Sequence, residues 1–175
     1  MKRIVPCFSL PIAIGIAFSN SLCSAQEHLK SPVPAINIHT TDGAVINTSS
    51  FSNNGRPMVI DFFATWCKPC VMELDAIADK YDYEQKRTGV KIILISVDSA
   101  LPSSGKVIKF VRSKGWRYEV YLDPSGDFQK AMKVMDTPAT YIVDGKGNIV
   151  WMHNSYNEGD ENKLFEELDK IAAIK

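Results

Sequence analysis

The sequence lacks a charge excess of either sign, and it is poor in histidine and cysteine. Its 175 residues carry 20 basic and 20 acidic side chains, and the basic residues form no dense tract. This balance argues against binding to nucleic acid or to an anionic membrane surface through charge. The 3 histidines and 4 cysteines also leave few ligands for a metal site. We therefore expect no nucleic-acid partner, no bound metal and no other cofactor.

The sequence also lacks an N-terminal hydrophobic run that spans a bilayer comfortably. The apolar stretch at residues 7–18 falls short of the roughly 20 residues that a spanning helix needs. A positively charged start precedes it and small or polar residues follow, so residues 1–25 have the layout of a secretory signal peptide. We expect export to the periplasm or another extracytoplasmic space. A retained anchor, or lipid attachment at Cys23, is less favoured, the latter because Leu22 is not small.

Removal of the signal changes what the cysteine count means. Two of the four cysteines leave with it, and the mature chain keeps only Cys67 and Cys70. An exported protein meets an oxidising environment, in which exposed thiols pair. A mature chain with one close cysteine pair and no other thiols is expected to use that pair for chemistry.

The rest of the chain reads as one domain after a short linker. Residues 26–34 are polar with two prolines, and residues 35–175 have the length of a single globular domain. Strands are expected at residues 36–40, 45–51, 58–64, 90–97, 118–122, 139–143 and 149–153, and helices at residues 67–89, 103–114, 125–133 and 160–174. Such alternation of strands and helices predicts a central sheet with helices on its faces.

The cysteine pair is expected at the start of a helix, and this position has chemical consequences. Free backbone amides and the helix dipole favour negative charge there, which lowers the pKa of the first thiol and supplies the nucleophilic thiolate. Lys68 adds a positive charge, and Pro69 suits the first turn of a helix. We assign Cys67 as the attacking thiol and Cys70 as the thiol that resolves the mixed disulfide.

Two other interpretations of the pair stay open at this point. A Cys-x-x-Cys motif is also half of a zinc site, although the mature chain has no second pair and its histidines are isolated. A purely structural disulfide is the other alternative. A bridge that closes so short a loop constrains the unfolded chain little, which disfavours this reading.

Residues 62–70, Phe-Phe-Ala-Thr-Trp-Cys-Lys-Pro-Cys, resemble the active-site segment of the thioredoxin superfamily. The resemblance is closest to the exported TlpA/ResA-like branch, which includes cytochrome c maturation thioredoxins, and it extends over residues 35–175. It implies an α/β thioredoxin fold with a central mixed β-sheet and helices on both faces. It also implies an N-terminal β-hairpin extension and a central βα insertion around residues 99–122.

The resemblance further implies a substrate-binding surface around the pair. In this family the proline that matches Pro138 is cis and lies beside the disulfide, where it exposes the backbone of Thr137 for pairing with an extended substrate segment. Trp66 is expected to pack beside the disulfide and to shield it. Together with Lys68 and Pro69, it is expected to contact the substrate. An ordinary loop proline is the alternative for Pro138.

Two acidic residues are candidates for proton transfer. Asp61 interrupts an apolar strand, where burial would raise its pKa. The matching aspartate of thioredoxins carries the proton of the second cysteine, whereas the TlpA/ResA-like branch more often has asparagine there. The resemblance also places a glutamate of that branch at Glu73, near the active site. Positions on the surface, without a catalytic role, remain the alternatives for both.

These observations predict an exported thiol–disulfide oxidoreductase, an enzyme that reduces disulfides in extracytoplasmic proteins. Its partners would be a disulfide- or dithiol-containing protein and, from the family, a membrane protein that donates electrons; we expect a monomer. A dithiol oxidant, a peroxiredoxin-like peroxide reductase and a metal-binding chaperone remain as alternatives. The residues themselves do not give the direction of electron flow or the substrate.

Overall fold

The structure is a computed structural model, and it describes residues 30–100, 102 and 105–173. The expected signal peptide at residues 1–25, with Cys23, lies outside the described residues. Within these ranges, no helix combines the length and the apolar character needed to cross a membrane.

Eight strands form one mixed sheet in the described part of the chain, in the order β1-β8-β7-β4-β5-β6-β2-β3. The strands are β1 (Ser31–Pro32), β2 (Asn37–Thr40), β3 (Val45–Asn47), β4 (Met58–Phe63), β5 (Lys91–Ser96), β6 (Glu119–Leu122), β7 (Ala139–Val143) and β8 (Asn148–Asn154). Strands β4, β5 and β6 are parallel neighbours, whereas β7 pairs antiparallel with both β4 and β8. The predicted mixed sheet is confirmed.

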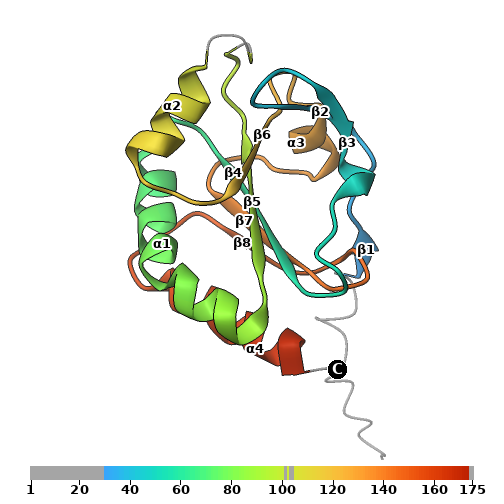
Figure 1. Ribbon diagram of the computed structural model, residues 1–175, viewed down its shortest axis with the longest axis vertical. Helices are drawn as coiled ribbons and strands as arrows, with labels where there is room; N and C mark the ends of the chain where they lie inside the picture. The colour runs from blue at the N-terminus through green and yellow to red at the C-terminus, as the bar shows by residue number, and fades with distance from the viewer. Residues whose placement is uncertain (1–29, 101, 103–104, 174–175) are drawn as a thin grey trace, which may run out of the picture.

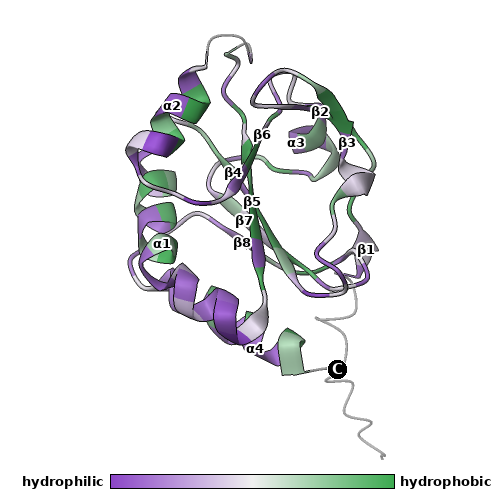
Figure 2. Ribbon diagram, in the orientation of Figure 1, coloured by the Kyte–Doolittle hydropathy of each residue, from purple (hydrophilic) through white to green (hydrophobic). Residues whose placement is uncertain are grey.

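The helices cover both faces of this sheet (Figure 1). They are α1 (Lys68–Thr88), α2 (Lys106–Ser113), α3 (Asp127–Ala131) and α4 (Asp160–Ala173). Apolar side chains of α1, α2 and α4 join one buried cluster, and Phe128 of α3 joins a second cluster on the opposite face. Helix α1 carries both hydrophobic and hydrophilic residues (Figure 2), and its buried residues recur at helical spacing, as a helix with one buried side requires.

Strand β4 lies at the centre and positions the site. All six of its residues are buried, because β5 and β7 flank it and helices cover both faces. Val59 and Phe63 belong to the cluster on the α1 face, and Ile60 and Phe62 belong to the other cluster. Since side chains alternate along a strand, Asp61 faces α1 together with Val59 and Phe63.

The N-terminal part differs from the expectation in two places. Ser31 and Pro32, expected in a linker, form β1 and pair with Ile149 and Asn148 of β8. The strand expected at residues 45–51 stops at Asn47, whose side chain accepts a hydrogen bond from the Ser49 amide and caps the short 3-10 helix η2 (Thr48–Ser50). The implied β-hairpin is present, since β2 and β3 pair antiparallel.

The segment between β5 and β7 carries the implied insertion. Helix α2 crosses from β5 to β6, and β6 lies between β5 and β2 in the sheet. The hairpin is thereby joined to the central sheet, because β2 pairs with β6. Helix α2 begins at Lys106, after Gly105 at its N-cap, and residues 103–104 of the expected helix lie outside the described ranges.

Candidate active site

Cys67 and Cys70 are joined by a disulfide at the junction between β4 and α1. Cys67 occupies the N-cap of α1, and its sulfur accepts a hydrogen bond from the Cys70 amide at 3.2 Å. Cys67 is 5% exposed and Cys70 is fully buried, so Cys67 is the more exposed residue of the pair. The amide that now contacts the Cys67 sulfur would stabilise a thiolate there after reduction.

Pro138 lies beside this disulfide. The Thr137–Pro138 peptide bond is cis, as the resemblance implies. The Thr137 carbonyl oxygen lies 3.6 Å from the Cys67 sulfur, although 70 residues separate the two in sequence. The loop before β7 therefore brings the Thr137 backbone to the Cys67 sulfur.

The surface around the disulfide is partly apolar and open. Trp66 is 73% exposed, and Lys68 and Pro69 are also exposed. This differs from the shielding role expected of Trp66, whose side chain packs little against the protein. Met135, just before the cis bond, is 88% exposed. Apolar side chains held in solvent at a reactive site are available to contact another protein.

Asp61 and Glu73 are buried and share a partner, Thr140 of β7. Asp61 is fully buried, and Glu73 is 3% exposed. The Thr140 hydroxyl oxygen lies 3.0 Å from Asp61 Oδ2 and 2.8 Å from Glu73 Oε1. The surface alternatives for both acids are therefore excluded. Thr140 was not among the predicted site residues, because in the sequence it looks like an ordinary β-branched residue of a buried strand.

Burial dominates the ionisation of both acids. It raises the pKa of Asp61 well above its usual range, and the nearby Glu73 carboxylate raises it further, while the hydrogen bond with Thr140 acts in the opposite direction. Burial also raises the pKa of Glu73 to about 7, against the effect of the hydrogen bond with Thr140. A buried carboxyl with a pKa near 7, such as Glu73, exchanges protons near neutral pH.

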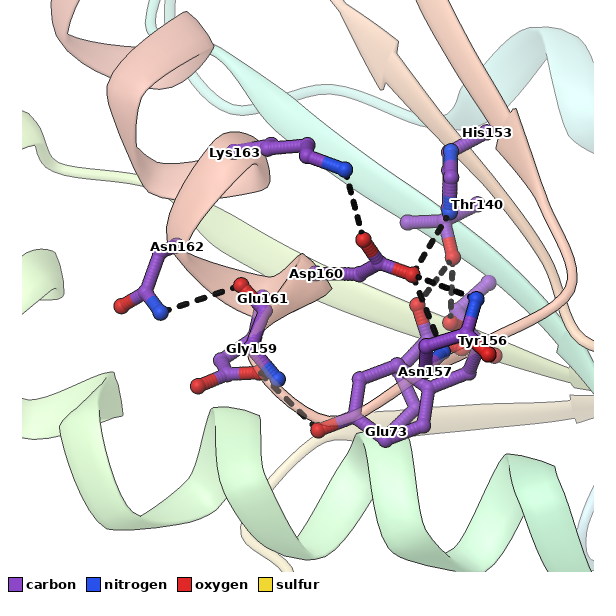
Figure 3. A network of polar contacts seen from close by, with 11 residues as sticks. Glu73, Thr140, His153, Tyr156, Asn157, Gly159, Asp160, Glu161, Asn162 and Lys163 are labelled. Carbon is purple, nitrogen blue, oxygen red and sulfur yellow. Dashed lines mark hydrogen bonds and ion pairs between the residues drawn. The ribbon is translucent and has the colours of Figure 1, made fainter.

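Glu73 lies beside an acidic network at the start of α4 (Figure 3). The negative charges of Asp160 and Glu161 add to the effect of burial on the pKa of Glu73. Lys163 contacts Asp160 at 2.7 Å, and Lys80 of α1 contacts Glu161 at 3.0 Å. These ion pairs moderate the negative field that α4 directs at Glu73.

A second polar cluster holds the loop that leads into Cys67. Asp98, which follows β5, is 3% exposed and accepts hydrogen bonds from the Thr65 amide at 2.8 Å and the Thr65 hydroxyl at 2.7 Å. The Ser96 hydroxyl and the Lys106 ammonium group also donate to it. Burial tends to raise the pKa of Asp98, but these hydrogen bonds outweigh it and lower the pKa. Asp98 was not among the predicted site residues, and the signal that could have indicated it is an acidic residue shortly after a buried strand.

Neither of the two histidines that the structure describes is brought together with the cysteine pair. His39 lies in β2 and His153 in β8, where its ring stacks on Trp151, and His28 lies outside the described residues. Among the residues that the structure describes, no three or more histidine, cysteine or acidic side chains cluster as metal ligands.

Residues 29–152 match the AhpC/TSA family. The chain belongs to this family. The matched range contains Asp61, Cys67, Cys70 and Pro138, whereas α4 and its acidic start lie beyond it.

Relatives of this AhpC/TSA chain include two curated bacterial proteins. Thiol-disulfide oxidoreductase ResA of Bacillus cereus is 27% identical over 171 residues, which are 97% of this chain and 94% of ResA. Thiol:disulfide interchange protein DsbE of Haemophilus influenzae is 33% identical over 133 residues, which are 75% of this chain and 67% of DsbE.

Solved structures support the same grouping. A thioredoxin-like protein from Porphyromonas gingivalis is 41% identical, with a TM-score of 0.72 over 81% of this chain and 92% of its own. StoA from Bacillus subtilis, at 19% identity, shares the fold with a TM-score of 0.58 over 77% of this chain and 97% of its own. The thioredoxin fold and the resemblance to ResA-like proteins are confirmed.

Proposed function

We propose that this thiol–disulfide oxidoreductase reduces disulfide bonds in extracytoplasmic proteins through Cys67 and Cys70. The observation that carries the proposal is the disulfide at the start of α1, with the Cys67 sulfur 3.6 Å from the Thr137 carbonyl oxygen that precedes cis-Pro138. ResA and DsbE, which align with this chain over most of its length, are named for thiol–disulfide chemistry. Signal-like residues 1–25 support export of the domain formed by residues 35–175.

Reduction of a substrate proceeds in two exchanges. The Cys67 thiolate attacks one sulfur of the substrate disulfide, so that a mixed disulfide forms and the other substrate sulfur leaves as a thiolate. Cys70 then loses its proton and attacks the Cys67 sulfur. The Cys67–Cys70 bond forms, the bond to the substrate breaks, and the substrate departs with both electrons.

The substrate meets the protein along the cis-proline loop. The backbone of Thr137 pairs with an extended segment on one side of Cys67, and the exposed Trp66, Lys68 and Pro69 contact the substrate on the other side. Binding of an extended chain to exposed backbone gives affinity with little dependence on side chains. We therefore propose that the substrates are proteins with an accessible disulfide in a flexible segment.

Asp61 and Glu73 serve the proton of Cys70. Cys70 and Glu73 lie one helical turn apart on the buried side of α1, and Asp61 faces the same helix from β4. Because Cys70 is buried and water cannot reach its thiol, a buried carboxylate has to accept the thiol proton. The enzyme then needs a donor that reduces its disulfide again, and we propose a membrane protein for this step. We further propose that the enzyme acts as a monomer.

Variants of the two cysteines test the mechanism. With insulin as substrate and dithiothreitol as donor, Cys67→Ser should lose turnover, and Cys70→Ser should accumulate a mixed disulfide that gel electrophoresis detects. Full turnover by Cys67→Ser would reject the assignment of the nucleophile. A peroxide-consumption assay on the same protein tests the peroxiredoxin-like alternative.

The reduction potential tests the direction of electron flow. Equilibration with glutathione should give a value nearer to about −270 mV, as in thioredoxin, than to about −120 mV, as in DsbA. A value near the second would identify the protein as an oxidant.

A further inference from the structure

We propose that Thr140 joins Asp61 and Glu73 into one proton-sharing unit and passes a proton between them while Cys70 is deprotonated. The proposal deepens the proposed function and rests on it. It makes Thr140 a positioning residue of the reaction, and it answers which of the two acids handles the proton: the pair does, through the hydroxyl between them.

The hydrogen count at Thr140 carries the inference. A hydroxyl has one hydrogen to donate, and an ionised carboxylate can only accept. Thr140 Oγ1 lies 3.0 Å from Asp61 Oδ2 and 2.8 Å from Glu73 Oε1, so it contacts an acidic oxygen on each side. It can donate to one of them only. The second contact is a hydrogen bond only if that carboxyl is protonated and donates to Thr140. The geometry therefore fits a pair that holds a proton, and two ionised carboxylates do not fit.

The fold places the three groups together by ordinary secondary structure. Asp61 and Thr140 are opposite each other in the antiparallel register of β4 and β7, so their side chains lie on the same face of the sheet. That face packs on α1, which contributes Glu73 one turn after Cys70. Thr140 thus bridges the sheet and the helix that carries the second cysteine.

The arrangement allows the proton to change sides without movement of heavier atoms. If Glu73 donates to Thr140 while Thr140 donates to Asp61, two short hydrogen shifts leave Asp61 protonated and Glu73 ionised. Asp61 Oδ1 and Glu73 Oε2 are buried, and neither accepts a hydrogen bond from the residues that the structure describes. Each carboxyl therefore keeps a free acceptor for an incoming proton.

The unit fits into the second exchange as follows. The Cys70 thiol gives its proton to the ionised carboxylate of the pair, and its electron pair forms the bond to the Cys67 sulfur. The bond between Cys67 and the substrate breaks, and the substrate sulfur leaves as a thiolate. The unit then gives up a proton to solvent or to that thiolate, so atoms and charge balance over the turnover.

Groups on the neighbouring elements bias where the proton resides. Those that face the unit are Tyr118 before β6, His153 in β8, Tyr156 in the following loop, and Asp160 and Glu161 at the start of α4. His153 is the partner of Thr140 in the register of β7 and β8, and its Nε2 lies 3.4 Å from Asp160. The negative charges of α4 lie on the side of Glu73 and favour the proton there (Figure 3).

Thr140→Val tests the relay because it keeps the shape of the side chain and removes the hydroxyl. Without the hydrogen bond that stabilises the ionised carboxylate, the acceptor for the Cys70 proton is less populated at neutral pH. The rate of the second exchange, followed by single-turnover release of a reduced substrate, should fall about tenfold. Its pH profile should move to higher pH by about one unit, since tenfold corresponds to one unit. Thr140→Ser retains a hydroxyl and should keep the wild-type profile.

Thr48→Val is the matched control. Thr48 is also buried, and its hydroxyl donates to the Pro34 carbonyl away from the site. This variant should lose stability without a change in the pH profile. A Thr140→Val profile that coincides with the wild-type profile overturns the relay, as does a shift in Thr140→Ser as large as that in Thr140→Val.

An infrared measurement on the oxidised wild-type protein needs neither a variant nor activity. The carbonyl-stretch band of a protonated carboxyl should persist at neutral pH, and isotope-labelled aspartate and glutamate should each carry part of it. Absence of that band overturns the shared proton, even if Thr140→Val does not fold. Failure of wild-type protein to reduce insulin would instead reject the proposed function, and the band would still report on the pair.

Discussion

At the scale of single residues, Glu73 links pH to stability because it is ionisable and lies inside the core. Its pKa rises from an ordinary value of 4.5 to about 7 on folding, mainly through burial. The folded state therefore binds more protons than the unfolded state between these values, and stability falls as pH rises through this window. We expect urea unfolding to show a loss of about 3 kcal/mol between pH 4.5 and pH 7, since one pKa unit corresponds to about 1.4 kcal/mol.

Glu73→Gln identifies the group responsible. The amide does not titrate, so the part of the slope that Glu73 contributes should disappear, and the variant should be more stable than the wild type above pH 7. Asp61 would keep a slope of its own, because burial also raises its pKa. Glu166→Gln, on the exposed side of α4, should leave the slope unchanged. A Glu73→Gln protein with the wild-type slope would contradict the assignment.

Substitutions of two tryptophans, one exposed and one buried, should have separate effects on substrate binding and on stability. Trp66 is 73% exposed beside Cys67, whereas Trp116 is buried, packs against Phe63 and donates a hydrogen bond to Asp75. Trp66→Ala should change the free energy of unfolding by no more than about 0.5 kcal/mol and raise KM for a protein substrate several-fold. Trp116→Ala should lose about 3–5 kcal/mol of stability. An unchanged KM for Trp66→Ala would contradict the proposed contact between Trp66 and the substrate.

At the scale of elements, Asp98 ties the end of β5 to the loop that carries Cys67. The buried carboxylate accepts hydrogen bonds from both the amide and the hydroxyl of Thr65, two residues before Cys67. Asp98→Ala leaves these donors without their acceptor, so we expect a loss of about 1–3 kcal/mol in the free energy of unfolding. Asp79→Ala, at an exposed position of α1, should stay within about 0.5 kcal/mol of the wild type.

The contribution of Asp98 to the free energy of unfolding depends on pH in the acidic range. Hydrogen bonds hold the pKa of Asp98 below its usual range, so its contribution is present above the unfolded pKa and is lost as pH falls through the folded pKa. The difference in stability between wild type and Asp98→Ala should therefore shrink at acidic pH. A difference that does not change with pH would show that shape, and not charge, accounts for the effect.

Local patterns predict most elements of this fold, and the exceptions have physical reasons. The helix at residues 67–89 is found as α1, since its apolar residues recur at helical spacing and Gly89, with a φ of 72°, ends it. Strand β1 was missed because Ser31 and Pro32 are two polar or restricted residues whose pairing depends on β8, more than a hundred positions away. Asn47 ends β3 early through a side-chain cap that strand periodicity does not reveal.

At the scale of the whole molecule, the site combines parts that the sequence shows with parts that only the fold brings together. Cys67, Cys70 and the residues between them form a local motif, and Asp61 is visible as a carboxylate in an apolar strand. Thr140 carries no such signal. Its two partners lie 79 and 67 residues away in sequence, and the contact exists only because β7 pairs with β4 and α1 packs on that face.

Opposing electrostatic effects around Cys67 determine whether the folded protein prefers the disulfide or the dithiol. The helix N-terminus and the Cys70 amide stabilise a thiolate at Cys67, whereas the buried pair of acids opposes further negative charge nearby. If the protein is a reductase, the folded state favours the disulfide relative to the unfolded chain. The oxidised protein should then unfold at a higher urea concentration than the reduced protein.

The difference in stability is a direct measure of the potential. A bridge between residues three apart adds little stability through chain entropy, so the difference in unfolding free energy between the two forms mainly reports thiolate energetics. Each 30 mV between the folded and unfolded couples corresponds to about 1.4 kcal/mol. Cys67→Ala/Cys70→Ala, which cannot form the bridge, should unfold identically with and without dithiothreitol. If the reduced protein were more stable than the oxidised one, the result would contradict the proposed reductase and indicate an oxidant, because oxidants such as DsbA stabilise the dithiol form.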